Sequence, residues 1–281
     1  MQVHVIDTGY FKLDGGAMFG VVPKTLWHPL NPADENNLCT WAMRCLLVED
    51  GNRLLLVDTG MGNKQDARFF GHYHPHGEAN LLDSIREAGF SFEDVTDVWL
   101  THLHFDHCGG AVKRGAAGSL DLVFPRATYW SNVAHWDWAT NPNAREKASF
   151  RQENILPILE SGHLGFLPVD GTAPFDGWTT RLVDGHTEKM MLPQFRYRDK
   201  TLVYLADLIP SAAHVPLPYV MGYDVRPLRT MEEKAALLNE AADEGYLLVF
   251  EHDPVYECAT VERTEKGVRI AWKGKLREFM S

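Results

Sequence analysis

Candidate metal ligands are concentrated in one ten-residue stretch of the chain, residues 101–110. The stretch contains the pattern His-x-His-x-Asp-His, formed by His102, His104, Asp106 and His107. Imidazole and carboxylate groups together suit zinc, iron or manganese. An apolar, β-prone run at 95–100 precedes the pattern and two glycines follow it, so we expect a strand that ends abruptly and presents these side chains at a sheet edge. The pattern therefore predicts a metal site, and the alternative is a chance cluster of surface histidines.

Three further strand-like runs are each followed by another candidate ligand. The runs at 179–183, 201–205 and 246–250 are short and rich in β-branched and aromatic residues. Any single residue beyond such a run could be a capping or core residue. Sites of α/β sheets usually lie where the strands end, however, and four strands here deliver metal-binding groups. We therefore expect the first stretch to be joined by His186, Asp207 and His252.

The 101–110 stretch resembles the signature of the metallo-β-lactamase superfamily, and the later candidates follow in the family's order. The resemblance implies an α/β fold, a four-layer αββα sandwich that carries one or two metals between two αβ halves. It implies that one metal is held by His102, His104 and His186. It implies that the other is held by Asp106, His107 and His252, with Asp207 bridging both. The expected cofactors are two divalent metal ions, zinc in the first place, with iron or manganese as alternatives.

This ligand set predicts hydrolysis. Two metals roughly 3.5–4 Å apart can share a water and lower its pKa towards neutrality, so that hydroxide attacks a carbonyl or phosphoryl centre. In the resembled family Asp106 lies between the metals and the leaving group and can pass a proton to it, which makes Asp106 the expected catalytic residue. No Ser-His-Asp or Cys-His nucleophile signature competes with this interpretation.

The expected substrate depends on which members of the superfamily the sequence resembles most. Leu-His-Phe-Asp-His-Cys-Gly-Gly resembles the quorum-quenching N-acyl-homoserine-lactone lactonases, and the block after Asp207 is similar to both these lactonases and the methyl-parathion-hydrolase branch. The best-known lactonases carry a Tyr three residues after the bridging Asp, a position that is Pro210 here. Tyr219, Tyr223 and His214 are candidate substitutes. We expect a small-molecule apolar ester or lactone as substrate, with an organophosphate triester or aryl ester as the alternative. A metal-binding, ligand-responsive module of the same fold is the non-enzymatic alternative.

Composition limits the other possibilities. The chain has 281 residues, of which 45% are hydrophobic, and we expect one domain over 1–281 with loop insertions near 61–79 and 131–162. The net charge of −11 and the lack of a basic run argue against nucleic acid. No apolar stretch approaches 18 residues and no signal peptide is visible, so we expect no membrane span and a cytoplasmic protein. A homodimer is kept open. The four cysteines should be free thiols.

Several elements can be placed from local signals. Strands are expected at 2–8, 41–49 and 53–58, with a hairpin turn between the last two. A helix over 80–88 should end at Gly89, and a helix over 230–244 should begin with a capping box of Thr230 and Glu233. A third helix is expected around 143–160, bent by a proline at position 157.

Four features keep two interpretations each. Asp58 could orient a ligating imidazole or cap a turn. The aromatic residues at 129–138 could line an apolar substrate wall or pack in the core. The histidines at 72–76 are expected to be solvated rather than to form a third metal site. Cys108 is expected to be a packing residue rather than a ligand.

Overall fold

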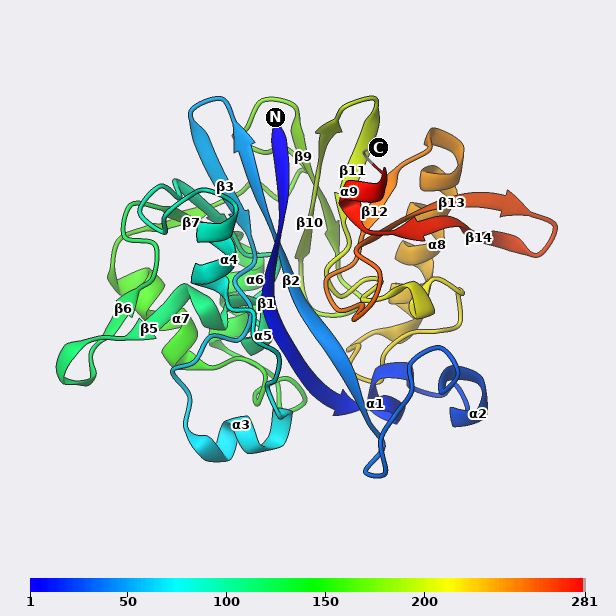
Figure 1. Cartoon of the computed structure of the whole chain (residues 1–281), viewed down its shortest axis with the longest axis horizontal. Coiled ribbons are helices and arrows are strands. Elements are labelled where there is room, and N and C mark those ends of the chain that lie inside the picture. The colour runs from blue at the N-terminus through cyan, green and yellow to red at the C-terminus, as the bar shows by residue number, and fades with distance from the viewer. Residues whose placement is uncertain (280–281) are drawn as a thin grey trace. The chain divides into compact units, whose positions relative to one another are not determined.

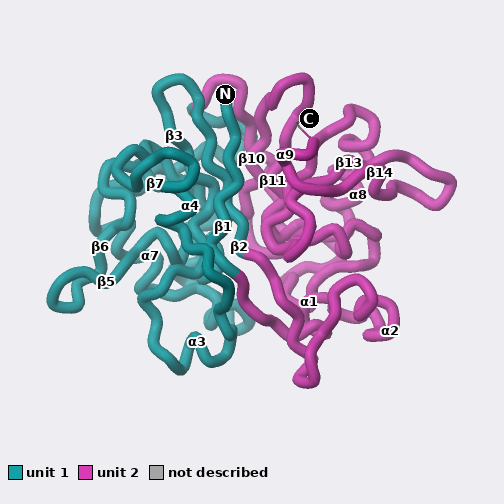
Figure 2. The backbone as a smooth tube through the Cα atoms, in the orientation of Figure 1, with its two compact units in different colours: residues 1–9, 43–174 teal, residues 10–42, 175–281 magenta. Residues whose placement is uncertain are grey.

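The computed structural model describes residues 1–279. Both strands and helices occur throughout the chain, which confirms the expected α/β class (Figure 1). The chain divides into two compact units, residues 1–9 with 43–174 and residues 10–42 with 175–281 (Figure 2). It passes from one unit to the other within β1 (Gln2–Asp14) and within β2 (Leu38–Asp50). Within the described residues 1–279, no helix is long and apolar enough to cross a membrane.

The first unit is built on parallel strands. The sheet has the order β1-β2-β3-β4-β7-β8, and β2 forms the expected antiparallel hairpin with β3 (Arg53–Val57). From β3 onward the neighbours are parallel: β4 (Asp97–Trp99), β7 (Thr128–Ser131) and β8 (Leu164–Phe166). Because parallel strands end at the same edge of a sheet, the residues after β3 and β4 come together there.

Short helices and one hairpin complete this unit. The helices are α3 (Ala67–Tyr73), α4 (Leu81–Glu87), α5 (Phe105–Cys108), α6 (Val133–Thr140) and α7 (Gln152–Glu160). The hairpin pairs β5 (Val112–Arg114) with β6 (Leu120–Leu122). The expected helix over 80–88 is confirmed as α4, whose first turn is capped by the Asn80 side chain. Ile85 of α4 and Ile155 of α7 are fully buried in one apolar cluster with Leu56 of β3.

The helix expected around 143–160 is confirmed only over its second part, α7, which contains Pro157. Residues 131–162 contain two helices, α6 and α7, and the segment between them is a turn. Asn143 causes this turn, because its side-chain oxygen accepts hydrogen bonds from the backbone N–H groups of Arg145 (2.9 Å) and Glu146 (3.1 Å). A side chain that satisfies these backbone groups locally competes with helix formation, and the helix begins only at Gln152.

The second unit has a mixed sheet in the order β14-β13-β12-β11-β10-β9. Its strands are β9 (Trp178–Val183), β10 (Met190–Tyr197), β11 (Lys200–Tyr204), β12 (Leu247–Val249), β13 (Cys258–Thr264) and β14 (Gly267–Gly274). β10 is antiparallel to both β9 and β11, and β11 is parallel to β12. Therefore β9, β11 and β12 all point the same way and end at one edge.

The helices of this unit include one long helix, α8 (Pro227–Glu244), and three short ones. The short helices are α1 (Gly15–Phe19), α2 (Lys24–Trp27) and α9 (Leu276–Phe279). The predicted capping box of α8 is wrong, because the helix begins three residues earlier with Pro227 at its first position, where proline is favoured. The Glu233 carboxylate instead accepts hydrogen bonds from the backbone N–H groups of Asp184 (2.9 Å) and Gly185 (3.0 Å). It thereby fixes the loop that leads from β9 to His186.

Candidate metal centre

Each strand-end candidate lies three positions beyond its strand. The pairs of strand end and candidate are Trp99 and His102, Val183 and His186, Tyr204 and Asp207, and Val249 and His252. The expected placement of these residues after strands is therefore confirmed. All seven candidate ligands are buried, although aspartate is mostly exposed in proteins and histidine is intermediate. Burying so many imidazole and carboxylate groups is costly unless they have partners.

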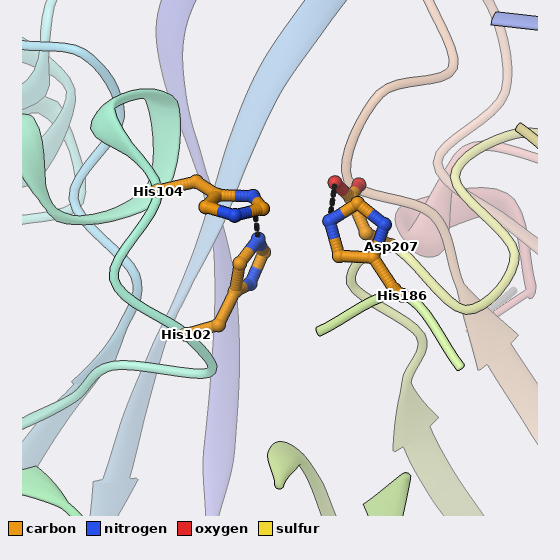
Figure 3. A group of neighbouring side chains, drawn as sticks. All are labelled: His102, His104, His186 and Asp207. Carbon is orange, nitrogen blue, oxygen red and sulfur yellow. Dashed lines mark hydrogen bonds and ion pairs between the residues drawn. The ribbon is translucent and has the colours of Figure 1, made fainter. Parts of the chain in front are cut away.

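Within the first unit, two pairs of candidate ligands face each other. His102 Nε2 lies 3.1 Å from His104 Nδ1, and Figure 3 shows the two rings turned toward one another. His107 Nε2 lies 3.9 Å from Asp106 Oδ2. In each pair the ligand atoms lie within 4.8 Å of each other, close enough to bind one ion.

Asp58 orients two of these imidazoles through the ring nitrogens that do not face another candidate ligand. Its Oδ2 lies 3.2 Å from His107 Nδ1, which is the contact that the orienting interpretation requires. The same oxygen accepts a hydrogen bond from the Thr101 hydroxyl (2.7 Å), and that hydroxyl lies 3.1 Å from His102 Nδ1. Asp58 itself has a left-handed backbone (φ 56°), a conformation that costs non-glycine residues energy and is often found at functional sites. One buried carboxylate thus orients His107 directly and His102 through Thr101.

Glu146 orients His104 in the same way, and no local sequence pattern marks it as part of the site. Its Oε1 lies 3.5 Å from His104 Nε2, and both side chains are buried. The other oxygen of Glu146 accepts hydrogen bonds from Trp138 Nε1 (2.8 Å) and from the Asn143 side chain. The turn at Asn143 therefore does more than end a helix: it delivers a carboxylate to the back of a candidate ligand.

The backbone of the ligand stretch is also held in place. The N–H of Leu103 donates a hydrogen bond to His135 Nε2 (2.9 Å), a fully buried ring on α6. A Cβ at Gly109 would lie 2.1 Å from the Met61 carbonyl oxygen, and one at Gly110 would lie 2.1 Å from that of Thr59. Only glycine permits this approach, which explains the Gly-Gly pair at the end of the stretch.

Within the second unit, Asp207 connects two imidazoles. Its Oδ2 lies 3.0 Å from His186 Nε2 and its Oδ1 lies 3.0 Å from His252 Nε2; Figure 3 shows the first of these contacts. The carboxylate therefore presents one oxygen to each ring. The preceding residue, Ala206, has a left-handed backbone (φ 42°), so this arrangement too is built on a strained turn.

The outer nitrogens of these two rings have partners as well. His186 Nδ1 lies 2.9 Å from Asp224 Oδ1, and His252 Nδ1 lies 2.7 Å from the Ala42 carbonyl oxygen. Burial lowers the pKa of His186, but the charges and hydrogen bonds of Asp207 and Asp224 outweigh it and raise that pKa to about 10. The site therefore strongly favours a positive charge at Nε2, whether from a proton or from a metal ion that replaces it.

The donor atoms fit a divalent metal. In every candidate histidine one ring nitrogen contacts an outer partner while the other faces a candidate ligand. Protein imidazoles that bind metals are held in this way, by a carboxylate, carbonyl or other polar group on the far nitrogen. Cys108 does not join the set, because burial raises the pKa of its thiol to about 12 and the sulfur donates to the Leu103 carbonyl (3.3 Å).

The aromatic residues at 129–138 belong mainly to the core. Tyr129 and Trp136 are buried in the apolar cluster of the first unit, and the Tyr129 hydroxyl accepts a hydrogen bond from the N–H of Phe124 (3.0 Å). A different aromatic group contacts the ligand stretch: the Phe105 ring has its centroid 4.4 Å from that of Tyr73 and 5.2 Å from that of Phe69. We call Phe69, Tyr73 and Phe105 the aromatic cluster.

His214 is not available to a substrate. Its Nδ1 lies 2.8 Å from Ser211 Oγ, its Nε2 lies 2.9 Å from the Met18 carbonyl oxygen, and its ring stacks on Phe19. Burial lowers its pKa to about 3, so the ring is neutral. The prediction that His214 could substitute for the tyrosine missing at position 210 is therefore wrong. The exposed side chains at 72, 74 and 76 are solvated, as expected.

The fold and these donor sets define a metallo-hydrolase. Residues 44–252 match the family model described as the metallo-beta-lactamase superfamily, and the chain belongs to this family. A probable metal-dependent hydrolase from Staphylococcus aureus has a similar structure, with a TM-score of 0.88 and 25% identity over 97% of this chain and 96% of that one. The expected metallo-β-lactamase fold is confirmed.

Relatives named as lactonases are also found. An N-acyl homoserine lactonase from Bacillus cereus is 30% identical over 140 residues, which are 46% of this chain and 49% of that protein. This chain thus matches about half the length of that relative. The structure titled "AidC, a Dizinc Quorum-Quenching Lactonase" has a TM-score of 0.76 and 24% identity, and the similarity covers 95% of this chain and 92% of that one. These similarities do not show the expected resemblance to the methyl-parathion-hydrolase branch, which stays a prediction.

Proposed function

We propose that the protein is a dinuclear metal-dependent hydrolase of neutral esters, in the first place of a lactone such as an N-acyl-homoserine lactone. The observation that carries this proposal is the carboxylate of Asp207, which presents one oxygen to His186 and the other to His252, both at 3.0 Å. A carboxylate used in this way is suited to join two ions rather than to bind one.

The proposed ligands are the seven residues already identified from the sequence, and zinc is the proposed metal. Two divalent ions held by this set would lower the pKa of a shared water and polarise the substrate carbonyl. The protein's own part is positioning. Asp58, Glu146 and Asp224 hold the imidazoles from behind, and the proposed role of Asp106 is to pass a proton to the leaving oxygen.

The aromatic cluster supports an apolar substrate with a hydrogen-bond acceptor. Phe105 stands between the candidate ligands His104 and Asp106 in sequence, and Tyr73 packs against it. Burial, and to a lesser extent the charge of Asp106, raises the pKa of Tyr73 to about 12, so its hydroxyl keeps its proton. Within residues 1–279 no hydrogen bond engages this hydroxyl. We propose that it donates to the substrate ester in place of the tyrosine that Pro210 replaces.

The test is a comparison of kcat/KM on the zinc-loaded protein. The substrates are acyl lactones of graded chain length, paraoxon-type triesters and aryl esters. We expect the lactones to be preferred, and longer chains to gain up to about 0.8 kcal/mol for each methylene that becomes fully buried. Triester turnover above that of every lactone would assign the protein to the alternative class. Equal kcat/KM for all acyl chain lengths would show that no apolar wall contacts the chain.

A further inference from the structure

A cavity of about 330 Å³ lies within the second unit, outside the metal ligands. Its walls come from four segments: residues 30–31, residues 212–216, residues 253–256 and strand β14. The lining is largely apolar and includes Leu30, Val215 and Ile270. This volume is at the lower end of the range for small-molecule sites, roughly 300–1,000 Å³, so the cavity suits a small ligand.

Two cationic side chains of β14, Arg269 and Lys273, line the same cavity. Both residues are exposed. Arg269 donates to its neighbouring carbonyl at Val268 (2.9 Å), and the Lys273 ammonium lies 4.0 Å from the centroid of the Tyr256 ring. Neither has an ion-pair partner among residues 1–279, whereas Lys275 pairs with Glu257 (3.3 Å). In a chain of net charge −11, two cations that line an apolar cavity and form no ion pair among residues 1–279 point to an anion.

One carboxylate also lines the cavity, but its charge is already compensated. Asp253 is buried, and its oxygens accept hydrogen bonds from three backbone N–H groups: those of Ala212 (2.9 Å), Val255 (2.8 Å) and Tyr256 (2.7 Å). Ala212 donates to Oδ2 of Asp253, whereas Val255 and Tyr256 both donate to Oδ1. These bonds connect two walls of the cavity. The side chains that could bind an anion are therefore those of β14, Arg269 and Lys273.

We propose that this cavity binds a small carboxylate with a short alkyl chain. The carboxylate is held by Arg269, whose planar fork matches its two oxygens, and by Lys273. The alkyl chain lies on the apolar lining. The site is independent of the metal ligands and of the reaction proposed above, because none of the seven candidate ligands lines the cavity.

The experiment is calorimetric titration of the zinc-loaded protein with octanoate, acetate and octan-1-ol. We expect one saturable octanoate site per chain, with acetate and octan-1-ol each bound roughly tenfold or more weakly, because acetate lacks the chain and octan-1-ol lacks the charge. The double variant Arg269→Gln/Lys273→Gln changes only exposed side chains and should weaken octanoate binding by a similar factor. The control Lys266→Gln/Arg277→Gln removes the same charge from exposed positions outside the cavity and should bind normally.

Two results would overturn the proposal. Octanoate binding that persists unchanged in Arg269→Gln/Lys273→Gln would place the carboxylate elsewhere, for example at the metals. Equal binding of octanoate and octan-1-ol would show an apolar cavity without anion recognition. Neither result depends on whether the protein hydrolyses lactones, so failure here and failure of the proposed function can be told apart.

Discussion

Asp224 Oδ1 lies 2.9 Å from His186 Nδ1, although 38 positions separate the two residues in the chain. The carboxylate fixes the imidazole so that Nε2 faces Asp207. Histidine ligands held in this way are better oriented and more basic toward a metal. Asp224 is therefore part of the metal site without being a ligand.

The first prediction concerns Asp224→Ala. Without this carboxylate the His186 ring loses its orientation and part of its basicity, so zinc affinity should fall by about 10–100-fold. Competition with a chromophoric chelator measures this affinity directly. Asp199→Ala, at an exposed turn between β10 and β11, is the matched control and should bind zinc normally. Equal affinities for the two variants would show that Asp224 does not support the site.

The second prediction concerns Tyr73→Phe. The ring that packs on Phe105 remains and only the hydroxyl is lost, so fold and zinc content should stay normal. If the hydroxyl donates to the ester, kcat/KM for lactones should fall about tenfold, since a lost hydrogen bond of this kind costs about 1–1.5 kcal/mol. Steady-state kinetics on one lactone, with kcat and KM separated, provides the measurement. An unchanged kcat/KM would remove Tyr73 from the mechanism.

The third prediction concerns Lys234, a buried residue of α8. Its ammonium donates hydrogen bonds to the carbonyls of Pro216 (2.9 Å), Leu217 (3.3 Å) and Tyr219 (2.8 Å). Lys234→Met leaves these acceptors without their donor and should lower the free energy of unfolding by about 1–3 kcal/mol. Urea unfolding of both proteins at pH 7 gives the difference, and Lys266→Met, at an exposed turn, should change it little.

Lys234 also predicts a pH dependence of stability. Burial lowers its pKa to about 7, whereas Asp224 acts in the opposite direction. Between about pH 7 and the ordinary lysine value near 10.4, the unfolded chain therefore binds more protons than the native protein, and this residue's contribution to stability rises with pH. The destabilisation by Lys234→Met should accordingly be larger at pH 9 than at pH 6. The opposite trend would contradict the assigned charge state.

The sequence predicts those site residues that follow a local pattern, and misses those that reach the site only through contacts between distant parts of the chain. The ligands could be found because each follows a strand, and strands have local patterns. Asp58 could be identified as a candidate for the same reason. Asp224 and Glu146 could not, because both lie in irregular segments and reach their histidines only through tertiary packing.

The wrong or open predictions also depend on tertiary contacts that the local sequence does not show. Thr230 and Glu233 have the spacing of a capping box, but Glu233 bonds instead to backbone groups 48 and 49 positions away. The aromatic residues at 129–138 matched a substrate wall as well as a core, and only packing could separate the two for Tyr129 and Trp136. The expectation of one domain over 1–281 stays a prediction.

A zinc titration tests whether two ions together support lactone hydrolysis. Metal-free protein is titrated with zinc while hydrolysis of an acyl-homoserine lactone is followed, with Asp207→Ala as the comparison. We expect activity to rise until two zinc ions are bound per chain. Asp207→Ala, which lacks the carboxylate between His186 and His252, should neither retain two ions nor turn over substrate. Full activity at one ion per chain, or an active Asp207→Ala that retains both ions, would contradict this expectation.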